Sequence, residues 1–354
     1  MKYYLALSII LVASLSANEN ANPDSKRNVI PKYFASGPPV DDPNAVEVPV
    51  KKGDKVILEY IPADEPFLTG PLLCPSGHTI PYGHIDLEPY VFFANNIGFY
   101  GNHWHIHRFS EPQDSINFQY LIQCGISEKF DFTFVPQLFY HYTGNQNNIR
   151  YGDFACGIGY QLYTSRYDSW LPTTKIGFMQ LFPSGEYDGL DILKLGTDVG
   201  GGGSYASNIK IVMTDLFYLG NHHFLSLRLS NSLTFFTNVK VHGANSYGGD
   251  DTTIGTVKPG WAYEIVLGSE FTLSRHWALA LDIDFVTTAA TTFEGTTIAS
   301  VGRDYRSDLL SFAPAIEYNF NANVGLIGGV WFTAYGRGSI DFTTGVIALN
   351  WFFP

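Results

Sequence analysis

Long runs of alternating hydrophobic and polar residues fill the chain from residue 84 to its end, separated by clusters of Gly, Asn, Asp and Ser. Each run is about 10 to 15 residues long, the length that a tilted strand needs to cross a bilayer. We therefore expect an all-β fold, a transmembrane antiparallel β-barrel of about 12 strands, an even number as in bacterial barrels. The predicted strands are 84–94, 115–125, 130–142, 150–164, 173–182, 205–219, 222–237, 260–273, 276–288, 307–320, 324–334 and 339–353.

The run 222–237 illustrates the two faces of such a strand. Leu225, Leu227 and Leu229 share one face, whereas Ser226 and Arg228 share the other. A half-buried strand of a soluble protein alternates in the same way. Almost every run after residue 84 does so, however, and the sequence shows no amphipathic helix that could cover a sheet, which favours a barrel over a soluble sandwich.

The lengths of the connections support this interpretation independently. Short connections alternate with long ones along the chain, and only the last connection breaks the alternation. Outer-membrane barrels have tight periplasmic turns and longer extracellular loops, so this alternation is expected of them. The short connections include 127–129, 219–222, 274–275 and 321–323, and the long ones include 95–114, 183–204, 238–259 and 289–306.

The last predicted strand is aromatic on one face. Ile347, Leu349, Trp351 and Phe353 share that face, which we expect to contact lipid, and Asn350 points inward. The pattern resembles the C-terminal strand by which the outer-membrane assembly machinery recognises its clients, although the chain ends in Pro where that signal ends in Phe. We therefore expect the strand to run toward the periplasm, with outer-membrane lipid and the assembly machinery as partners.

Composition and charge agree with this class of protein. Aromatic residues make up 16% of the chain and charged residues 15%, whereas soluble domains are roughly a quarter charged. A lipid-facing wall with aromatic girdles uses such a composition. The net charge of −12, without a cluster of Lys and Arg, argues against nucleic acid as a partner.

Two segments precede the predicted barrel, residues 84–354. Residues 1–17 have the order of a signal peptide, with Lys2, an apolar run over 5–13 and then small residues. Residues 18–83 are rich in proline, which forbids a continuous ladder, so we expect an extended, partly disordered segment with one possible short strand at 55–61. The sequence leaves open whether this segment plugs the barrel or lies in the periplasm.

Several short segments carry a resemblance to a known family. They are 124–142 (CGISEKFDFTFVPQLFYHY), 151–162 (YGDFACGIGYQL), 181–188 (LFPSGEYD), 309–334 and 344–353. Together they resemble the putative outer-membrane transporters of the meta-cleavage (MetA) pathway of phenol degradation, over roughly residues 80 to 354. The resemblance implies a bacterial outer-membrane location and passive uptake of small hydrophobic or aromatic compounds.

The residues on the polar face of the predicted strands are the candidate lumen lining. A Lys or Arg on the lipid face would cost about 2–4 kcal/mol at the midplane, so inward placement is expected. The acidic excess favours passage of cations over anions, unless the charges pair with one another and fill a narrow barrel. The candidates are Asp86, Glu88, Asn117, Gln119, Asp131, Asp153, Lys175, Lys210, Arg228, Glu264, Glu270, Asp282, Asp284 and Glu317.

Other patterns offer weaker candidates for chemistry, and we expect neither a metal site nor a cofactor. His103, His105 and His107 alternate and would share one face of a strand, but no carboxylate follows at ligand spacing. His141 and Asp153 could form a pair at the outer rim, although no nucleophile motif accompanies them. The leading function is a channel or transporter for a small-molecule solute, and the alternatives are a structural or surface-interaction barrel with a plugged pore and a rim-located hydrolase.

Overall fold

The computed structural model describes residues 32–33, 46–52, 55–61, 66–165, 171–220 and 223–354. The predicted signal peptide, 1–17, lies outside the described residues. Within the described ranges, no helix has both the length and the apolar character needed to cross a membrane.

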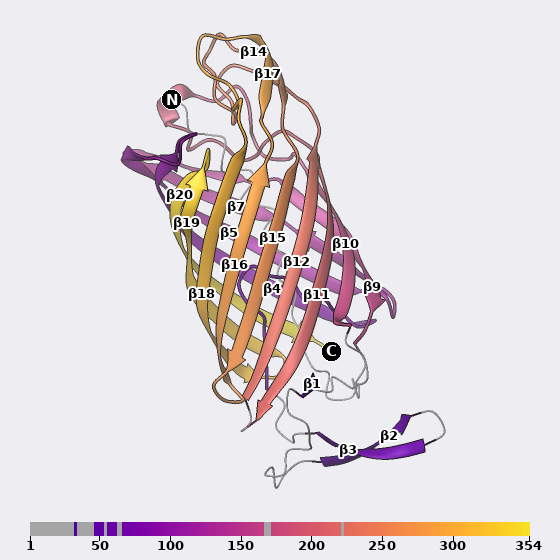
Figure 1. Cartoon of the computed structure of the whole chain (residues 1–354). Helices are drawn as coiled ribbons and strands as arrows, with labels where there is room; N and C mark the ends of the chain where they lie inside the picture. Colours follow the sequence, from indigo (N-terminus) through magenta and orange to yellow (C-terminus); the bar gives the residue numbers. More distant parts are fainter. Residues whose placement is uncertain (1–31, 34–45, 53–54, 62–65, 166–170, 221–222) are drawn as a thin grey trace.

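Twelve antiparallel strands close into a barrel (Figure 1). The first strand closes it by pairing with the second and with the last: Ile85 lies opposite Cys124 on one side and Phe353 on the other. Two of the strands are interrupted once each. The strands are β4 (Ile85–Tyr100), β5 (Ile106–Gly125), β6 (Phe130–Val135) continued by β7 (Gln137–Thr143), β9 (Phe154–Tyr163) preceded by β8 (Gln146–Tyr151), β10 (Thr173–Phe182), β11 (Ala206–Gly220), β12 (His223–Phe236), β15 (Ala262–Thr272), β16 (Trp277–Thr288), β18 (Ser307–Asn321), β19 (Val324–Arg337) and β20 (Ile340–Phe353).

The two interruptions lie side by side in the wall. Pro136 separates β6 from β7, because proline has no N–H to give to the ladder. On the neighbouring strand Gly152 and Asp153 separate β8 from β9, and the Gly152 N–H donates to the Gln137 carbonyl at 2.9 Å. The prediction of single unbroken strands at 130–142 and 150–164 was therefore wrong at these positions.

The twelve predicted strands are otherwise found close to their expected bounds, and the all-β barrel is confirmed. The main error is the first connection, 95–114, which was expected to be a long loop. Instead β4 and β5 continue as a paired hairpin to Tyr100 and Ile106. These extensions carry polar residues on both faces, so the apolar alternation that marks a lipid-crossing strand ends before the strands do.

The outer face of the wall is apolar and the inner face is largely polar. Ile347 and Trp351 on β20 are 49% and 47% exposed, whereas Asn350 between them is 4% exposed. The predicted orientation of the last strand is thus confirmed. A closed barrel with an apolar outer surface satisfies every backbone group inside a bilayer, so the chain has the architecture of a transmembrane β-barrel.

The long loops form an ordered cap at one end of the barrel, which the sequence did not predict. Part of 238–259 and 289–306 folds into a three-stranded sheet of β13 (Val239–His242), β14 (Ile254–Lys258) and β17 (Thr292–Thr296), which stands above the barrel in Figure 1. Val239, Val241 and Val257 form its core with Tyr247. The cap therefore has its own apolar core, which a set of free loops would lack.

The glycine run 200–203, within the loop 183–204, packs against an earlier part of that loop and against the cap. The N–H groups of Gly200 and Gly201 donate to the Glu186 carbonyl at 2.7 and 3.0 Å, and the Gly202 carbonyl accepts from the Tyr247 hydroxyl at 2.6 Å. Gly200 and Gly201 are buried. Their lack of a side chain permits this close packing, since a Cβ at Gly200 would lie 2.5 Å from the carbonyl oxygen of Tyr151.

At the other end, where the short turns lie, β2 (Val46–Lys52) and β3 (Lys55–Ile61) form a separate hairpin (Figure 1). The possible strand at 55–61 is therefore confirmed. The two-residue β1 (Lys32–Tyr33) pairs in parallel with the end of β11. The described strands β1, β2 and β3 of the N-terminal extension therefore lie at the short-turn end.

The lipid face predicts a depth-dependent effect of charge. Leu267 lies midway along β15 and is 45% exposed, and Leu273 follows the end of the same strand and is also 45% exposed. We expect Leu267→Arg to lower the free energy of unfolding of the vesicle-inserted barrel by about 2–4 kcal/mol and Leu273→Arg by about 0–1 kcal/mol. Denaturant titration of the vesicle-inserted protein measures both. Equal losses would contradict the assignment of the lipid face.

Candidate functional site

A stretch of the N-terminal extension without helix or strand, residues 66–81, lies within the barrel, and we call it the inner segment. At its start the Phe67 N–H donates to the carbonyl of Arg275, in the short turn between β15 and β16, at 3.2 Å. Just beyond its end Gly83 donates to Gly125, where β5 ends, at 3.1 Å. Between these points Leu72, Leu73 and Cys74 are 0% exposed. The segment therefore enters and leaves at the short-turn end and reaches the middle of the lumen.

Carboxylates of the barrel wall accept the backbone N–H groups of the inner segment. A chain without secondary structure has buried donors that need acceptors. Here four acidic side chains from four different wall strands provide them, and charged acceptors form the stronger class of hydrogen bond. The pairs are Thr69 with Glu317, Gly70 with Glu270 at 2.8 Å, Leu73 and Cys74 with Asp282 at 3.0 Å each, and Ile80 with Asp131 at 3.2 Å.

Neutral side chains complete this set of hydrogen bonds. Gly77 donates to the Thr214 hydroxyl at 2.7 Å, and Thr79 donates to the Gln161 Oε1 at 2.8 Å. Gln161 Nε2 donates in return to the Gly77 carbonyl at 2.9 Å. The prolines of the segment have no N–H, so they need no acceptor in the lumen. The proline content that forbids strand pairing thus also reduces the number of donors that burial must satisfy.

The closest contacts with the wall are made where side chains are absent. Gly70 has a φ of +106°, which disfavours other residues, and a Cβ there would lie 2.8 Å from Arg228 Nη1. On the wall a Cβ at Gly268 would lie 2.6 Å from the Cβ of Cys74. These two glycines allow the backbone of the segment to reach the charged groups below it.

Arg228 and Glu270 form the most deeply buried ion pair of the lumen. Arg228 Nη2 lies 3.1 Å from Glu270 Oε2, and both side chains are 0% exposed. Glu270 Oε1 accepts the N–H of Gly70, so both carboxylate oxygens are engaged. Removing one partner of such a pair typically costs about 3–5 kcal/mol, because the other charge remains buried.

The predicted lumen residues are mostly buried, and several have partners on the wall itself. Asn350 Nδ2 joins Asp86 at 2.9 Å to Glu88 at 3.3 Å. Asp284 accepts from Ser311 at 3.1 Å. Half-buried members are Asn117, Lys210 and Glu264, and the buried ones are Asp86, Glu88, Gln119, Asp131, Asp153, Lys175, Arg228, Glu270, Asp282, Asp284 and Glu317.

The sequence left open whether the acidic face lines a path or is occupied by other groups. Glu317, Glu270, Asp282 and Asp131 bind the inner segment, so they do not line an empty aqueous path in this structure. The sequence did not reveal their partners, since the donors are backbone groups. Gln161, Thr214 and Asn319 also contact the segment and were missed, although they lie on the same alternating face as the predicted residues.

The inner wall also has an aromatic side that the sequence analysis overlooked. On β4, Tyr90 and Phe92 are buried and stack at 5.7 Å, and Trp331 of β19 meets Phe342 of β20 at 5.0 Å. They belong to the same apolar cluster as Leu72 and Leu73. The inner segment therefore lies between acidic groups and an aromatic wall.

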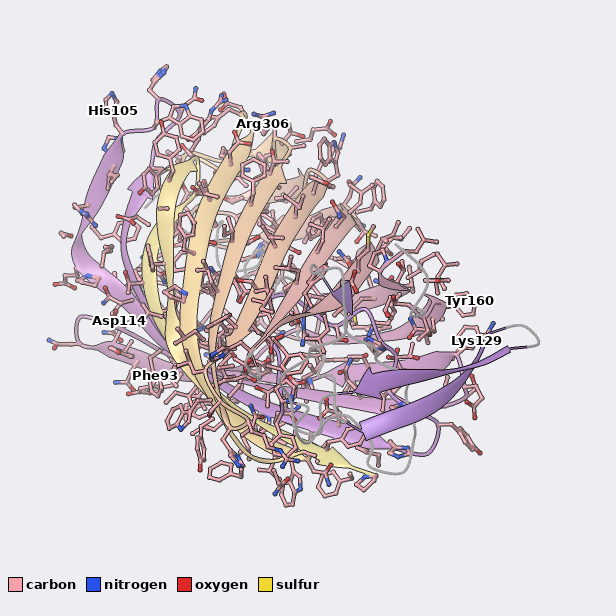
Figure 2. The ribbon with its side chains drawn as sticks, turned by 60° about the horizontal axis from the view of Figure 1, so that its bottom comes forward. Phe93, His105, Asp114, Lys129, Tyr160 and Arg306 are labelled. Atoms are coloured by element: carbon pink, nitrogen blue, oxygen red, sulfur yellow. The ribbon has the colours of Figure 1, made fainter. Side chains whose placement is uncertain are left out.

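The weaker candidates for chemistry do not assemble into a site. Asp153 accepts the N–H groups of Gly185 and Gly202 at 2.9 Å each, and no hydrogen bond or ion pair between described residues joins it to His141. His103, His105 and His107 lie exposed in and beside the β4–β5 turn, whose rim position Figure 2 shows for His105. Across the described part of the chain, no three His, Cys, Asp or Glu side chains are placed to hold a metal ion.

A half-buried arginine, Arg303, joins the cap to the wall strands. Arg303 donates from Nε to the Tyr305 carbonyl at 2.8 Å and from Nη1 to the Gly338 carbonyl, between β19 and β20, at 2.9 Å. Burial lowers the pKa of Arg303 to about 10, which still leaves the guanidinium charged at neutral pH. The cap thus closes on the rim through charge-assisted hydrogen bonds.

Comparison with known proteins identifies the fold. No family model matches the sequence, and no curated protein matches it. Among solved structures, the COG4313 outer membrane channel from Pseudomonas putida F1 is similar with a TM-score of 0.61 at 12% identity, over 78% of this chain and 98% of that one. The KdgM porin in complex with disordered oligogalacturonate is more distant, with a TM-score of 0.36 at 9% identity over 75% of this chain and 99% of the porin. The chain has the fold of an outer-membrane channel.

The hydrogen bonds of Asp282 predict how firmly the inner segment is held. Asp282→Ala removes the acceptor of Leu73 and Cys74, which at about 1.5–3 kcal/mol per charged hydrogen bond should raise opening of the segment at least tenfold. We expect Cys74 to react with a maleimide at least about tenfold faster in this variant. Labelling is followed by mass spectrometry with Cys124 and Cys156 replaced by Ser.

Asp284→Ala is the matched control for this measurement. Asp284 lies two residues along the same face and binds Ser311, with no hydrogen bond to the inner segment. Cys74 should therefore stay as unreactive in this variant as in the parent protein. Equal acceleration in both variants would contradict a specific role for Asp282.

Proposed function

We propose that this protein is a channel for passive uptake of small solutes across the outer membrane, with residues 66–81 acting as a plug of its lumen. The observation that carries the proposal is that the inner segment occupies the lumen and is held there by side chains of the wall. No strand of the barrel wall pairs with it. It can therefore leave the lumen without breaking the ladder that closes the barrel.

The fold supports the channel class. The COG4313 outer membrane channel is similar over most of both chains. A likeness at 12% identity carries the architecture and not the solute. The polar inner face provides the path, with diffusion through sites of modest affinity that a solute can both enter and leave.

Two observations favour small hydrophobic or aromatic solutes. The short motifs of the sequence resemble the family of the meta-cleavage pathway of phenol degradation. The aromatic residues of the inner wall, Tyr90, Phe92, Trp331 and Phe342, belong to the same buried apolar cluster as the leucines of the inner segment. An apolar solute that takes the place of Leu72 and Leu73 would meet these rings, which bind apolar surface well.

A permanently held inner segment would instead make the protein a structural or surface-interaction barrel. The number of hydrogen bonds between segment and wall favours this second candidate, and the folded cap offers a surface to other envelope components. A rim-located hydrolase receives no support, because Asp153 is engaged by backbone N–H groups at the base of the cap. The aromatic C-terminal strand keeps the assembly machinery as a proposed partner.

Currents through planar bilayers distinguish the two candidates. We expect stepwise currents from the purified full-length protein, with openings at least about tenfold more frequent in Asp282→Ala, because that variant loses two hydrogen bonds to the plug. Asp284→Ala should behave as the parent protein. If the parent and both variants insert as folded barrels and none gives stepwise current, the channel is excluded and the structural barrel remains.

A further inference from the structure

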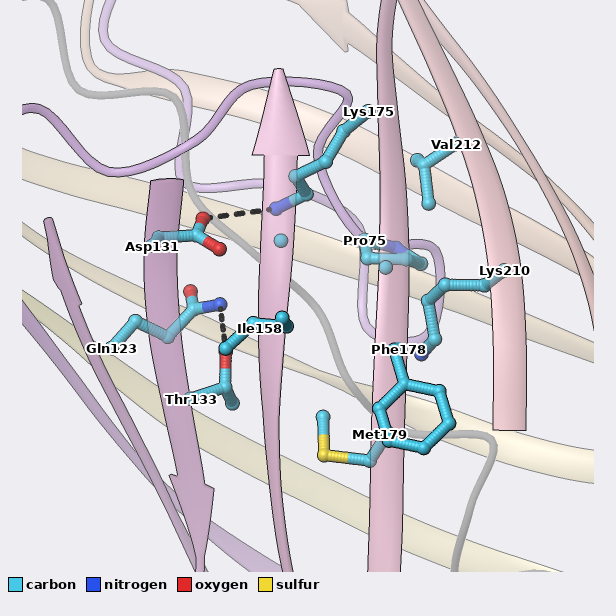
Figure 3. Close-up of a pocket in the computed structure, with 12 residues that line it drawn as sticks. Pro75, Gln123, Asp131, Thr133, Ile158, Lys175, Phe178, Met179, Lys210 and Val212 are labelled. Atoms are coloured by element: carbon cyan, nitrogen blue, oxygen red, sulfur yellow. Dashed lines mark hydrogen bonds and ion pairs between the residues drawn. The ribbon is translucent and has the colours of Figure 1, made fainter. Parts of the chain in front are cut away.

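A small cavity lies between the inner segment and the wall formed by β6, β9, β10 and β11. Its volume is about 40 Å³, enough for a group somewhat larger than a water molecule. Pro75 of the inner segment forms one side of it, and Figure 3 shows this residue between two lysines that come from neighbouring strands. The cavity is lined by Pro75, Gln123, Asp131, Thr133, Lys175 and Lys210, with further contacts from β9, β10 and β11.

The two lysines differ in their electrostatic surroundings. Lys175 Nζ lies 3.4 Å from Asp131 Oδ2, so its charge is compensated. Lys210 makes no hydrogen bond and no ion pair with any residue that the structure describes. Glu264 is the carboxylate on the same row of the wall, but Ser232 of β12 separates the two positions and donates to Glu264 at 3.1 Å. The cavity thus contains one positive charge without a direct partner.

The wall is shaped to keep these side chains in the cavity. Lys210 lies opposite Gly177 in the ladder, and a Cβ at Gly177 would come within 2.9 Å of Lys210 Cγ. A Cβ at Gly159 would likewise lie 3.0 Å from Lys175 Cδ. Glycine at both positions lets the lysine stems lie flat against β9 and β10. Met179 and Val212 add apolar surface beside the ammonium groups.

We propose that this cavity binds the carboxylate group of a small organic anion, with Lys210 as its principal contact. An ammonium without a hydrogen-bonded counter-ion matches a monoanion. The limited volume excludes a large polyanion, and the apolar lining favours an organic carboxylate over a strongly hydrated inorganic ion. Gln123, whose Nε2 donates to the Thr133 hydroxyl at 3.2 Å, supplies further polar surface. The cavity thus adds an anion-binding site to a lumen whose net charge is negative.

The role of this site in transport rests on the proposed channel function, whereas binding itself does not. Pro75 closes the cavity toward the lumen, so departure of the inner segment would open the site to a passing solute. A solute that carries both an apolar part and a carboxylate would then meet the aromatic wall and Lys210. Binding can be measured in the closed state with a probe small enough for the cavity.

The test is titration of the full-length protein in detergent micelles with ¹³C-labelled acetate, followed by broadening of the methyl resonance. We expect saturable broadening with the parent protein and at least a tenfold higher apparent Kd for Lys210→Met, which keeps most of the length of the side chain and removes its charge. Lys240→Met, at an exposed lysine of β13 in the cap, is the matched control and should bind as the parent does. Acetamide, the neutral analogue, should not compete.

Three results would overturn the proposal. They are equal binding by Lys210→Met and the parent, competition by acetamide at the same concentrations as acetate, and displacement of acetate by inorganic phosphate at lower concentrations than acetate itself requires. Circular dichroism confirms that each variant retains its strands. The bilayer currents are recorded separately, so loss of the anion site with currents retained is distinguishable from failure of the channel function.

Discussion

The buried backbone N–H groups of the inner segment set the constraint on which the lumen depends. A chain that lies inside the barrel without strand pairing must find acceptors for its donors, and carboxylates inside a protein need donors to offset their lost hydration. Burying either the N–H donors or the carboxylates without the other would cost free energy. Together Glu317, Glu270, Asp282 and Asp131 satisfy the segment, and the segment satisfies them. The acidic face of the wall is therefore explained by what it holds.

The same constraint explains the contrast between the two halves of the lumen. On one side charged groups and glycines bring the wall close to the peptide backbone, as Gly268 does beneath Cys74. Elsewhere on the wall, aromatic rings share one buried apolar cluster with the leucines of the segment. An extended chain presents both backbone and side chains, so a wall that holds it needs both kinds of surface. A solute with an apolar part and a polar group has similar needs.

The lipid and the cap impose different requirements on the outside. The wall strands need apolar residues at every second position wherever lipid is present, and beyond the lipid that need ends, so the extended β4–β5 hairpin carries polar residues on both faces. The cap has no lipid to contact and builds a small core of its own around Val239 and Tyr247. Apolar residues thus alternate at every second position in the strands that face lipid, whereas in the cap they gather in a compact core.

The sequence by itself determined the barrel, its strand number, the face of each strand and the direction of Trp351, because contact with lipid imposes a regular alternation on each strand separately. It also marked most of the lumen charges, since charge is excluded from the lipid face. Only the tertiary structure decided what those charges do. Asp282 meets Leu73 and Cys74 across about two hundred residues of sequence, and the donors are backbone groups that every residue except proline has. The folded cap and the position of Lys210 beside Pro75 were likewise found only in the tertiary structure. Packing between segments far apart in the chain leaves no periodic pattern in the sequence.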